Sequence, residues 1–344
     1  MGAQHQHVPL VVSPAAGLPE LREALAHRYR QRGASINAEQ VLVTAGAKTA
    51  LFALFSEMLQ PGDDVLMPTP NWFGFYDLVH RAGGVLRTLP LAASDNYTLR
   101  PDTLRAALTQ ATRLLVISNP NNPTGRVYSR AEWAVILAVT AEFPNLWVLS
   151  DEIYEGICFS PTPVATLLAL PDPQQRHVVV SGFSKSLALA GWGVGCLVAP
   201  TKLAQAVAAR LFSTGVAVPV PVQAAALAAT QHADAIGTAL CADLGGRRQL
   251  LLAGLEALPG APAIVAPDGT YYIFADFTRF LDPNLPAATA SAQLVEQLMA
   301  GGVEAVNGAT CGAPGFVRLS YAVEEAALQL ALVRLREVLG PLMS

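Results

Sequence analysis

Residues 177–198 read HVVVSGFSKSLALAGWGVGCLV, and this stretch places two short apolar runs on either side of a single lysine. The runs at 177–181 and 195–198 are nearly free of polar side chains, as in strands that helices cover on both faces of a sheet. Similar runs recur earlier in the chain, separated by helical patterns, at residues 41–43, 64–67, 84–89, 114–118 and 146–150. Strands that alternate with helices indicate α/β architecture.

The helical patterns help to divide the chain into domains. They fall at residues 18–32, 48–59, 130–142 and 324–338. At 344 residues the chain is long enough for two domains, because single cores stop growing at about 250–300 residues. The alternation of strands and helices weakens after residue 250. We therefore expect a large domain over residues 18–250 and a smaller domain over residues 251–344, which residues 1–17 join.

Composition and charge exclude several classes of partner. Hydrophobic residues make up 52% of the chain and charged residues 14%, which is typical of a compact globular protein. The net charge is −4 and no basic block is present, so we expect no binding to nucleic acid or to an anionic membrane. The longest charge-free run, residues 211–233, contains Gly215, Pro219 and Pro221, which would break a membrane-spanning helix. The N-terminus lacks a signal pattern, and we expect a cytoplasmic location.

The cysteines and histidines give no sign of a metal site. The four cysteines are far apart, without a Cys-x-x-Cys spacing, and no histidine cluster accompanies them: Cys158, Cys196, Cys241 and Cys311. We therefore expect reduced thiols and no bound metal. His5 and His7 form an isolated pair near the N-terminus, and we assign them no chemistry.

Lys185 is one of three lysines in the chain, with Lys48 and Lys202. Thirteen uncharged residues follow Lys185, so we expect its amine in a partly desolvated site where the neutral form is favoured. A neutral lysine amine can form an imine with a carbonyl compound. A surface lysine with its stem along apolar side chains would explain this segment equally well, and other motifs must decide.

Three further segments place polar groups directly after expected strands, where ligands of open α/β sheets bind. SNPNNPTG (118–125) directs amide side chains toward this edge, and SDEIY (150–154) adds a carboxylate and a phenol. TAGAK (44–48) runs from a strand into the beginning of a helix, a place where backbone N–H groups bind anions.

Taken in order, these segments resemble the class I/II aminotransferases, which are pyridoxal-phosphate enzymes of fold type I. The resemblance extends from GLPELREAL (17–25) through PGDDVLMPTPNW (61–72), NPNNPTG (119–125), SDEIYE (150–155), FSK (183–185) and GW (191–192) to VRLSYA (317–322). It implies a large domain with a mostly parallel seven-stranded sheet and a smaller α+β C-terminal domain. It also implies transfer of an amino group from an L-amino acid to a 2-oxo acid, in a homodimer whose site lies at the subunit interface.

The resemblance also implies roles for individual residues around pyridoxal 5'-phosphate. Lys185 would hold the cofactor as an internal aldimine and later move a proton at the substrate Cα. Asp151 would keep the pyridine nitrogen protonated, so that the ring accepts electrons. Tyr154 and Asn122 would hydrogen-bond the 3-oxygen of the ring.

The remaining implied contacts hold the cofactor's ring and phosphate and the substrate. Trp72 would stack on the ring, and the backbone N–H groups of Ala47 and Lys48, with the Ser184 hydroxyl, would bind the phosphate. Arg318 would bind the substrate α-carboxylate through two parallel hydrogen bonds. Taken singly, such residues are more often caps, core aromatics or surface charges, and it is their combination that favours function. Tyr271 and Tyr272 are equally explained as substrate-side residues or as core.

The chain departs from the family pattern around the phosphate. The family usually writes Gly-Trp-Arg-x-Gly, with the arginine on the phosphate, where this chain has Gly193. A hydroxyl residue three before the lysine is Gly182 here, and a tyrosine before GLPELR aligns with Val12. Three explanations stay open: Arg210 or Lys48 replaces the arginine, the cofactor binds weakly, or the site accepts an altered cofactor. We favour weak-to-moderate binding.

Two other functions on the same scaffold stay open. After Cα deprotonation a pyridoxal-phosphate lyase or replacement enzyme would eliminate a β or γ group, and a non-catalytic relative would keep the fold alone. The glycines at 191, 193 and 195 do not make a dinucleotide fingerprint, because they precede a strand rather than open a helix.

GLPELR begins after sixteen residues, whereas relatives usually have several dozen more, which puts the substrate lid and dimer contacts in doubt. No clear second arginine for a side-chain carboxylate is present, so neutral or aromatic donors are as well supported as aspartate.

Overall fold

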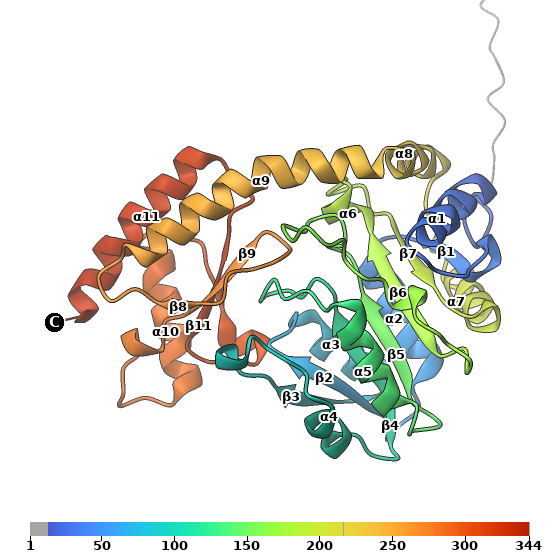
Figure 1. The fold of residues 1–344 in the computed structure, drawn as a ribbon, viewed down its shortest axis with the longest axis horizontal. Coiled ribbons are helices and arrows are strands. Elements are labelled where there is room, and N and C mark those ends of the chain that lie inside the picture. The colour runs from blue at the N-terminus through green and yellow to red at the C-terminus, as the bar shows by residue number, and fades with distance from the viewer. Residues whose placement is uncertain (1–12, 216, 344) are drawn as a thin grey trace, which may run out of the picture.

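The computed structural model describes residues 13–215 and 217–343, which form two sheets and the helices that cover them (Figure 1). The larger sheet has seven strands in the order β1-β7-β6-β5-β4-β2-β3. Its strands are β1 Val41–Thr44, β2 Asp64–Thr69, β3 Val85–Pro90, β4 Thr112–Ser118, β5 Trp147–Asp151, β6 His177–Gly182 and β7 Gly195–Val198. All seven strands expected from the sequence are present. Val12, His5 and His7 lie outside the described residues.

The pairing within the larger sheet is mostly parallel. Strand β7 runs antiparallel to its neighbours β1 and β6, and the remaining pairs are parallel. Since β1 and β6 both oppose β7, they run in the same direction as each other and as β2 to β5. The carboxyl ends of six strands therefore meet at one edge. The predicted α/β fold with a mostly parallel seven-stranded sheet is confirmed.

Helices cover both faces of this sheet, which explains the nearly continuous apolar runs. Along β6, Val179 packs into the core beneath α1 and α5, while Val178 and Val180 face the core beneath α2 and α7. The helices of the larger part are α1 Pro19–Gln31, α2 Ala47–Met58, α3 Gly74–Arg81, α4 Pro101–Ala107, α5 Arg130–Thr140, α6 Phe183–Ser186, α7 Thr201–Ser213 and α8 Val220–Gln231. The expected helices at 18–32, 48–59 and 130–142 correspond to α1, α2 and α5.

The second sheet is antiparallel, with strand order β10-β11-β9-β8. Its strands are β8 Ala263–Ile264, β9 Tyr272–Asp276, β10 Val306–Asn307 and β11 Phe316–Ser320, and its helices are α10 Ala287–Ala300 and α11 Glu325–Leu339. These elements enclose a core of their own, which includes Ile273, Leu298 and Leu335. The helix expected at 324–338 is α11, and the smaller α+β part is confirmed.

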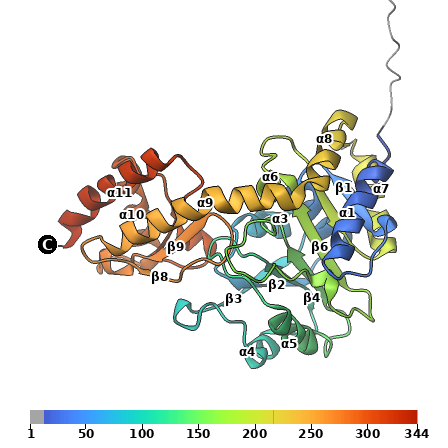
Figure 2. The same cartoon turned by 45° about the horizontal axis from the view of Figure 1, so that its top comes forward.

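Helix α9 (Ala233–Glu256) connects the two parts and extends from α8 to the helices of the second sheet (Figures 1 and 2). The expected boundary at residue 250 falls inside this helix. Ala16 accepts a hydrogen bond from the backbone of Val43 in β1, at 3.0 Å. The assignment of residues 18–250 and of residues 251–344 with 1–17 to two domains stays a prediction. Within the described part of the chain, no helix has the length and apolar character needed to cross a bilayer.

Candidate active site

A cavity of about 490 Å³ opens at the carboxyl ends of the parallel strands. This volume lies within the range of about 300–1,000 Å³ that small-molecule sites occupy. Every residue expected at the site from the sequence lines it: Ala47, Lys48, Trp72, Asn122, Asp151, Tyr154, Ser184, Lys185 and Arg318. Strands β1, β4, β5 and β6 deliver most of them, because the chain leaves each of these strands at the same edge.

One corner of the cavity forms where β1 leads into α2. Gly46 has φ +88°, a conformation that favours glycine, and α2 begins directly after it. The twelve-residue helix directs its free N–H groups toward the cavity. Gly195 at the start of β7 makes this approach possible, since a Cβ there would lie 2.7 Å from the backbone nitrogen of Ala47.

Asp151 is the last residue of β5 and is only 7% exposed. Its carboxylate accepts a hydrogen bond from the backbone N–H of Ile153 at 3.2 Å, and no ion pair to it forms among the described residues. Burial raises the pKa of Asp151 to about 7; the Ile153 N–H acts in the opposite direction, and the neighbouring Glu152 carboxylate adds to the rise. A buried, unpaired carboxylate of this kind favours a proton donor as its ligand.

Lys185 lies in the short helix α6, directly after β6, beside a cluster of three tyrosines. Its Nζ is 5.6 Å from the centroid of the Tyr271 ring. Tyr154 Oη and Tyr272 Oη are 3.1 Å apart and hydrogen-bonded, and the two rings meet edge to face. Burial raises the pKa of Tyr154, and the neighbouring tyrosines add to the rise. Tyr272 lines the cavity, which supports its interpretation as a substrate-side residue. The rings of Tyr154 and Tyr272 also pack in the core of the second sheet.

Arg318 comes from β11 of the second sheet and reaches across to the first part of the chain. Its Nη1 donates to Asn122 Oδ1 at 2.9 Å. Its guanidinium lies over the Tyr272 ring, 4.3 Å from the centroid. Arg318 thus brings a planar cation to the cavity from the opposite sheet.

Trp72 and Lys48 lie close together in the cavity wall. Lys48 Nζ is 5.3 Å from the centroid of the Trp72 ring. The Trp72 ring also packs edge to face on Phe75, with centroids 5.3 Å apart. Its backbone is fixed by Asn71, whose side-chain oxygen accepts from Trp72 N at 2.8 Å. The aromatic ring therefore has a defined position, with a cation beside it.

Gly193, where the arginine of the family pattern is missing, faces open space. Its φ is +63°, and a Cβ there would meet no atom within 4 Å. Of the two replacements considered from the sequence, Arg210 pairs with Glu57 at 2.8 Å and does not line the cavity. Lys48 lines the cavity and forms no ion pair among the described residues. The geometry therefore favours Lys48 as the additional cation.

Sequence reasoning missed several residues of the wall. Phe73, next to Trp72, is 43% exposed and lines the cavity, as do Ser118 and Ile153. Ser118 ends β4 and donates to Asn71 Oδ1 at 2.9 Å. Their positions directly beside expected site residues were the available signal.

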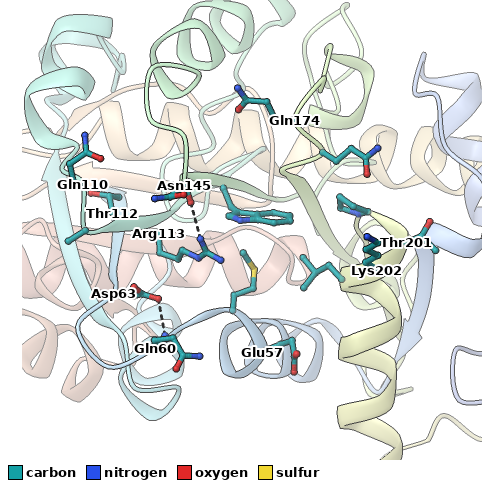
Figure 3. Close-up of a pocket in the computed structure, with 16 residues that line it drawn as sticks. Glu57, Gln60, Asp63, Gln110, Thr112, Arg113, Asn145, Gln174, Thr201 and Lys202 are labelled. Atoms are coloured by element: carbon teal, nitrogen blue, oxygen red, sulfur yellow. Dashed lines mark hydrogen bonds between the residues drawn. The ribbon is translucent and has the colours of Figure 1, made fainter.

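A larger hollow of about 940 Å³ lies at the opposite edge of the sheet (Figure 3). It lies at the amino ends of β2, β4 and β5, and none of the residues expected at the site line it. Charges of both signs surround it, including Asp63, Arg113 and Lys202, and Arg113 donates to the backbone oxygen of Asn145 at 3.3 Å (Figure 3). Its lining gives no preference for one class of ligand.

The chain is similar in sequence and in fold to known proteins. Residues 6–335 match the family model described as aminotransferase class I and II. The chain is 36% identical over 337 residues to an aspartate/prephenate aminotransferase of Thermus thermophilus, covering 95% of this chain and 83% of the relative. It is 32% identical over 329 residues to an aspartate aminotransferase of Rhizobium meliloti, covering 93% and 79%. The solved structure of Thermus thermophilus aspartate aminotransferase with maleate superposes with a TM-score of 0.87 at 34% identity, covering 96% of this chain and 84% of that one.

Proposed function

Because the chain belongs to the class I and II aminotransferases, enzymes of amino-group transfer, we propose that it binds pyridoxal 5'-phosphate in the 490 Å³ cavity and there transfers the amino group of an L-amino acid to a 2-oxo acid. The observation that carries the proposal is that the Lys185 amine and the buried, unpaired Asp151 carboxylate line the same cavity. Such a pair fits a ligand that is an aldehyde at one position and a protonated base at another.

The remaining residues of the wall fit the other groups of this cofactor. The beginning of α2 and the Ser184 hydroxyl offer donors to a phosphate. Trp72 offers a ring face, and Asn122 and Tyr154 offer polar groups to the 3-oxygen. Lys48 supplies a positive charge near the same corner, which the phosphate requires where Gly193 carries no side chain. Each part of the cofactor therefore meets a residue of suitable chemistry.

When bound, pyridoxal 5'-phosphate supplies an aldehyde that reacts with amines and a ring that accepts electron density. Lys185 would hold the cofactor through its aldehyde group and, with its amine free, would take a proton from the substrate Cα as a general base and return one to the product. Asp151 would keep a proton on the ring nitrogen, because its buried carboxylate forms no ion pair among the described residues.

Arg318 orients the substrate. Its guanidinium binds the α-carboxylate through two parallel hydrogen bonds, a geometry that lysine cannot supply. The donor is aspartate, as the names of the relatives indicate, or a neutral or aromatic amino acid. Within the described residues the cavity is lined by three basic side chains, Lys48, Lys185 and Arg318, and the proposal already assigns a role to each, so a second carboxylate has no dedicated partner.

We also propose a homodimer. Phe73 and Trp192 are 43% and 49% exposed although both are large and apolar, and they lie beside Trp72 and Gly191 in the cavity wall. A second copy of the chain would cover them. Sedimentation equilibrium measures the mass, and a monomer at micromolar concentration would refute this part of the proposal. The cytoplasmic location stays a prediction.

The proposed function is tested by loading the purified protein with pyridoxal 5'-phosphate and reducing it with borohydride. Mass spectrometry should find the cofactor mass on the peptide that contains Lys185, and Lys185→Ala should gain none. The unreduced protein, given an amino donor and 2-oxoglutarate or pyruvate, should form a new amino acid. Release of ammonia in its place would indicate an elimination enzyme, and no bound cofactor would indicate a non-catalytic relative; both results contradict the proposal.

A further inference from the structure

Two carboxylates next to Asp151 are buried without contacting the cavity. The Glu152 side chain is completely buried, and that of Glu155 is 10% exposed. Neither residue lines the cavity. Both belong to the short segment 151–155, which carries Asp151 and Tyr154 into the proposed cofactor site. Two charges so close together need a partner, because unpaired buried charges are costly.

The partner is Arg32, which directly follows α1. Its Nη2 is 3.2 Å from Glu152 Oε2, and its Nη1 is 2.7 Å from Glu155 Oε2. One planar guanidinium therefore bridges both carboxylates, with one nitrogen for each. A lysine has a single ammonium group and cannot reproduce this fork. Burial lowers the pKa of Arg32 and the two carboxylates raise it by more, so the guanidinium stays charged. Burial raises the pKa of Glu152, and Arg32 acts against that rise.

The bridge continues to the long helix between the two sheets. Arg28, one turn earlier in α1, contacts Glu155 Oε1 at 3.0 Å and Asp234 Oδ1 at 2.8 Å. Asp234 lies in the first turn of α9. Burial raises the pKa of Glu155, and Arg32 and Arg28 outweigh it, so the net shift is downward and the carboxylate stays ionised.

Neutral hydrogen-bond donors also hold the Glu152 carboxylate, whereas the Glu155 carboxylate is held by arginines. Glu152 Oε1 accepts from the Thr166 hydroxyl at 3.0 Å and from Leu167 N at 2.9 Å. Among the described residues, no neutral donor of this kind contacts the Glu155 carboxylate, which is held by Arg28 and Arg32. Arg32 is the one that also contacts Glu152. It therefore sets the spacing between the two ends of the turn on which Tyr154 lies.

We propose that Arg32 is a positioning residue: by bridging Glu152 and Glu155 it holds segment 151–155 so that the Asp151 carboxylate faces the cofactor's ring nitrogen. This inference rests on the proposed function. Without the guanidinium, two buried carboxylates lose their common cation, and the segment moves toward water or takes up protons. A displacement of about 1 Å at a reacting group is enough to cost a large factor in function.

The alternative is that Arg32 only stabilises the fold, and a pair of ligands separates the two roles. One ligand is pyridoxal 5'-phosphate, and the other is its analogue with carbon in place of the ring nitrogen, which cannot use Asp151. Both are titrated into apoprotein, followed by absorbance, for wild type, Arg32→Met, Asp151→Ala and the control Arg30→Met. Arg30 lies in the last turn of α1, two residues before Arg32, and pairs with the exposed Glu23 at 2.5 Å.

Arg32→Met should weaken the binding of pyridoxal 5'-phosphate by about 10-fold or more, a loss similar to that seen at metal sites when a residue that orients a ligand is removed. It should weaken the binding of the analogue far less. Asp151→Ala should show the same selectivity, and Arg30→Met should change neither affinity. Equal losses for both ligands, or no loss for either, would overturn the inference. If urea denaturation shows that Arg32→Met is not folded, Arg32→Lys is titrated with both ligands instead. The ratio of its losses of affinity for the two ligands then decides. If wild type binds no cofactor, the proposed function itself is wrong, which is a separate result.

Discussion

Asp151 is held in an environment that opposes its charge, and this has a consequence for the protein without cofactor. Its pKa is raised by burial to about 7 in the fold, against about 3.9 in an unfolded chain. A raised pKa means that the folded state binds the proton more tightly. The stabilisation from this proton is complete below pH 4 and is lost as the pH rises through 7.

We therefore expect the unfolding free energy of the apoprotein to fall by about 2–4 kcal/mol between pH 4 and pH 7 because of this one group. Asp151→Asn removes the titration, so that variant should lack this part of the decline. Urea unfolding at a series of pH values measures both curves. Asp102→Asn is the control, since that side chain is 96% exposed. Parallel curves for wild type and Asp151→Asn would show that the carboxyl group is not buried in solution.

Lys48 provides a second test at the scale of single residues. If its ammonium replaces the missing guanidinium, Lys48→Met should weaken pyridoxal 5'-phosphate by about 10- to 100-fold, since a hydrogen bond to a charged group is worth about 1.5–3 kcal/mol. Arg210→Met should leave the affinity unchanged, because Arg210 pairs with Glu57 outside the cavity. Titration of the apoproteins measures both constants. If Arg210→Met weakened cofactor binding and Lys48→Met did not, Arg210 would be the residue that binds the phosphate.

The positions of the candidate site residues at strand ends could be predicted from the sequence, and contacts between distant segments behind the cavity could not. Asp151 and Lys185 follow apolar runs, and a charge in that place is informative. Arg32 directly follows an ordinary amphipathic helix, and nothing local shows that its partner Glu152 is 120 residues further along the chain. The choice between Lys48 and Arg210 likewise needed three-dimensional proximity.

At the scale of elements, α5 is fixed at its start by reciprocal hydrogen bonds. Ser129 Oγ accepts from Glu132 N at 3.2 Å, and Glu132 Oε2 accepts from Ser129 N at 2.9 Å. Ser129→Ala should lower the unfolding free energy by about 1 kcal/mol, because the helix loses this cap. Ser213→Ala is the control, since that hydroxyl donates only to Arg210 O within α7. Urea unfolding that shows equal effects for both variants would contradict a capping role.

Elements with strong patterns were predictable, and weakly patterned ones were not. Apart from the partly exposed β3, the strands of the larger sheet are largely apolar and buried, and all seven lie between helical patterns, so each was expected close to its observed bounds. Strands β8 and β10 have two residues each, too few for any periodicity to show. Their existence depends on pairing with β9 and β11, which is a tertiary contact.

At the scale of the whole molecule, the loop after β4 joins the two parts. Gly125 O accepts from Asp268 N at 3.1 Å and from Gly269 N at 2.9 Å. Gly125 has φ +71°, and a Cβ there would contact Pro267 and approach the Gly269 oxygen to 2.8 Å. An alanine would therefore be strained and would also push the two parts away from each other.

Gly125→Ala should lower the unfolding free energy by about 2–3 kcal/mol, of which about 1–2 is backbone strain, and should also weaken cofactor binding, since Asn122 lies on the same loop. Gly83→Ala is the matched control. Its φ is +88° and a Cβ there meets no atom within 4 Å, so it should show the strain alone, with unchanged cofactor affinity. Urea unfolding and cofactor titration measure both. Equal behaviour of the two variants would mean that the junction tolerates displacement.

Arg318 belongs to β11 of the smaller sheet, and Lys185 lies in α6, directly after β6 of the larger sheet. A substrate that contacts both residues would therefore connect the two parts of the chain. Without substrate, Arg318 and Asn122 are joined across the cavity by a hydrogen bond of 2.9 Å. Under the proposed function, a substrate carboxylate would compete with Asn122 for the Arg318 guanidinium, and the substrate would then replace this hydrogen bond as the link between the two parts.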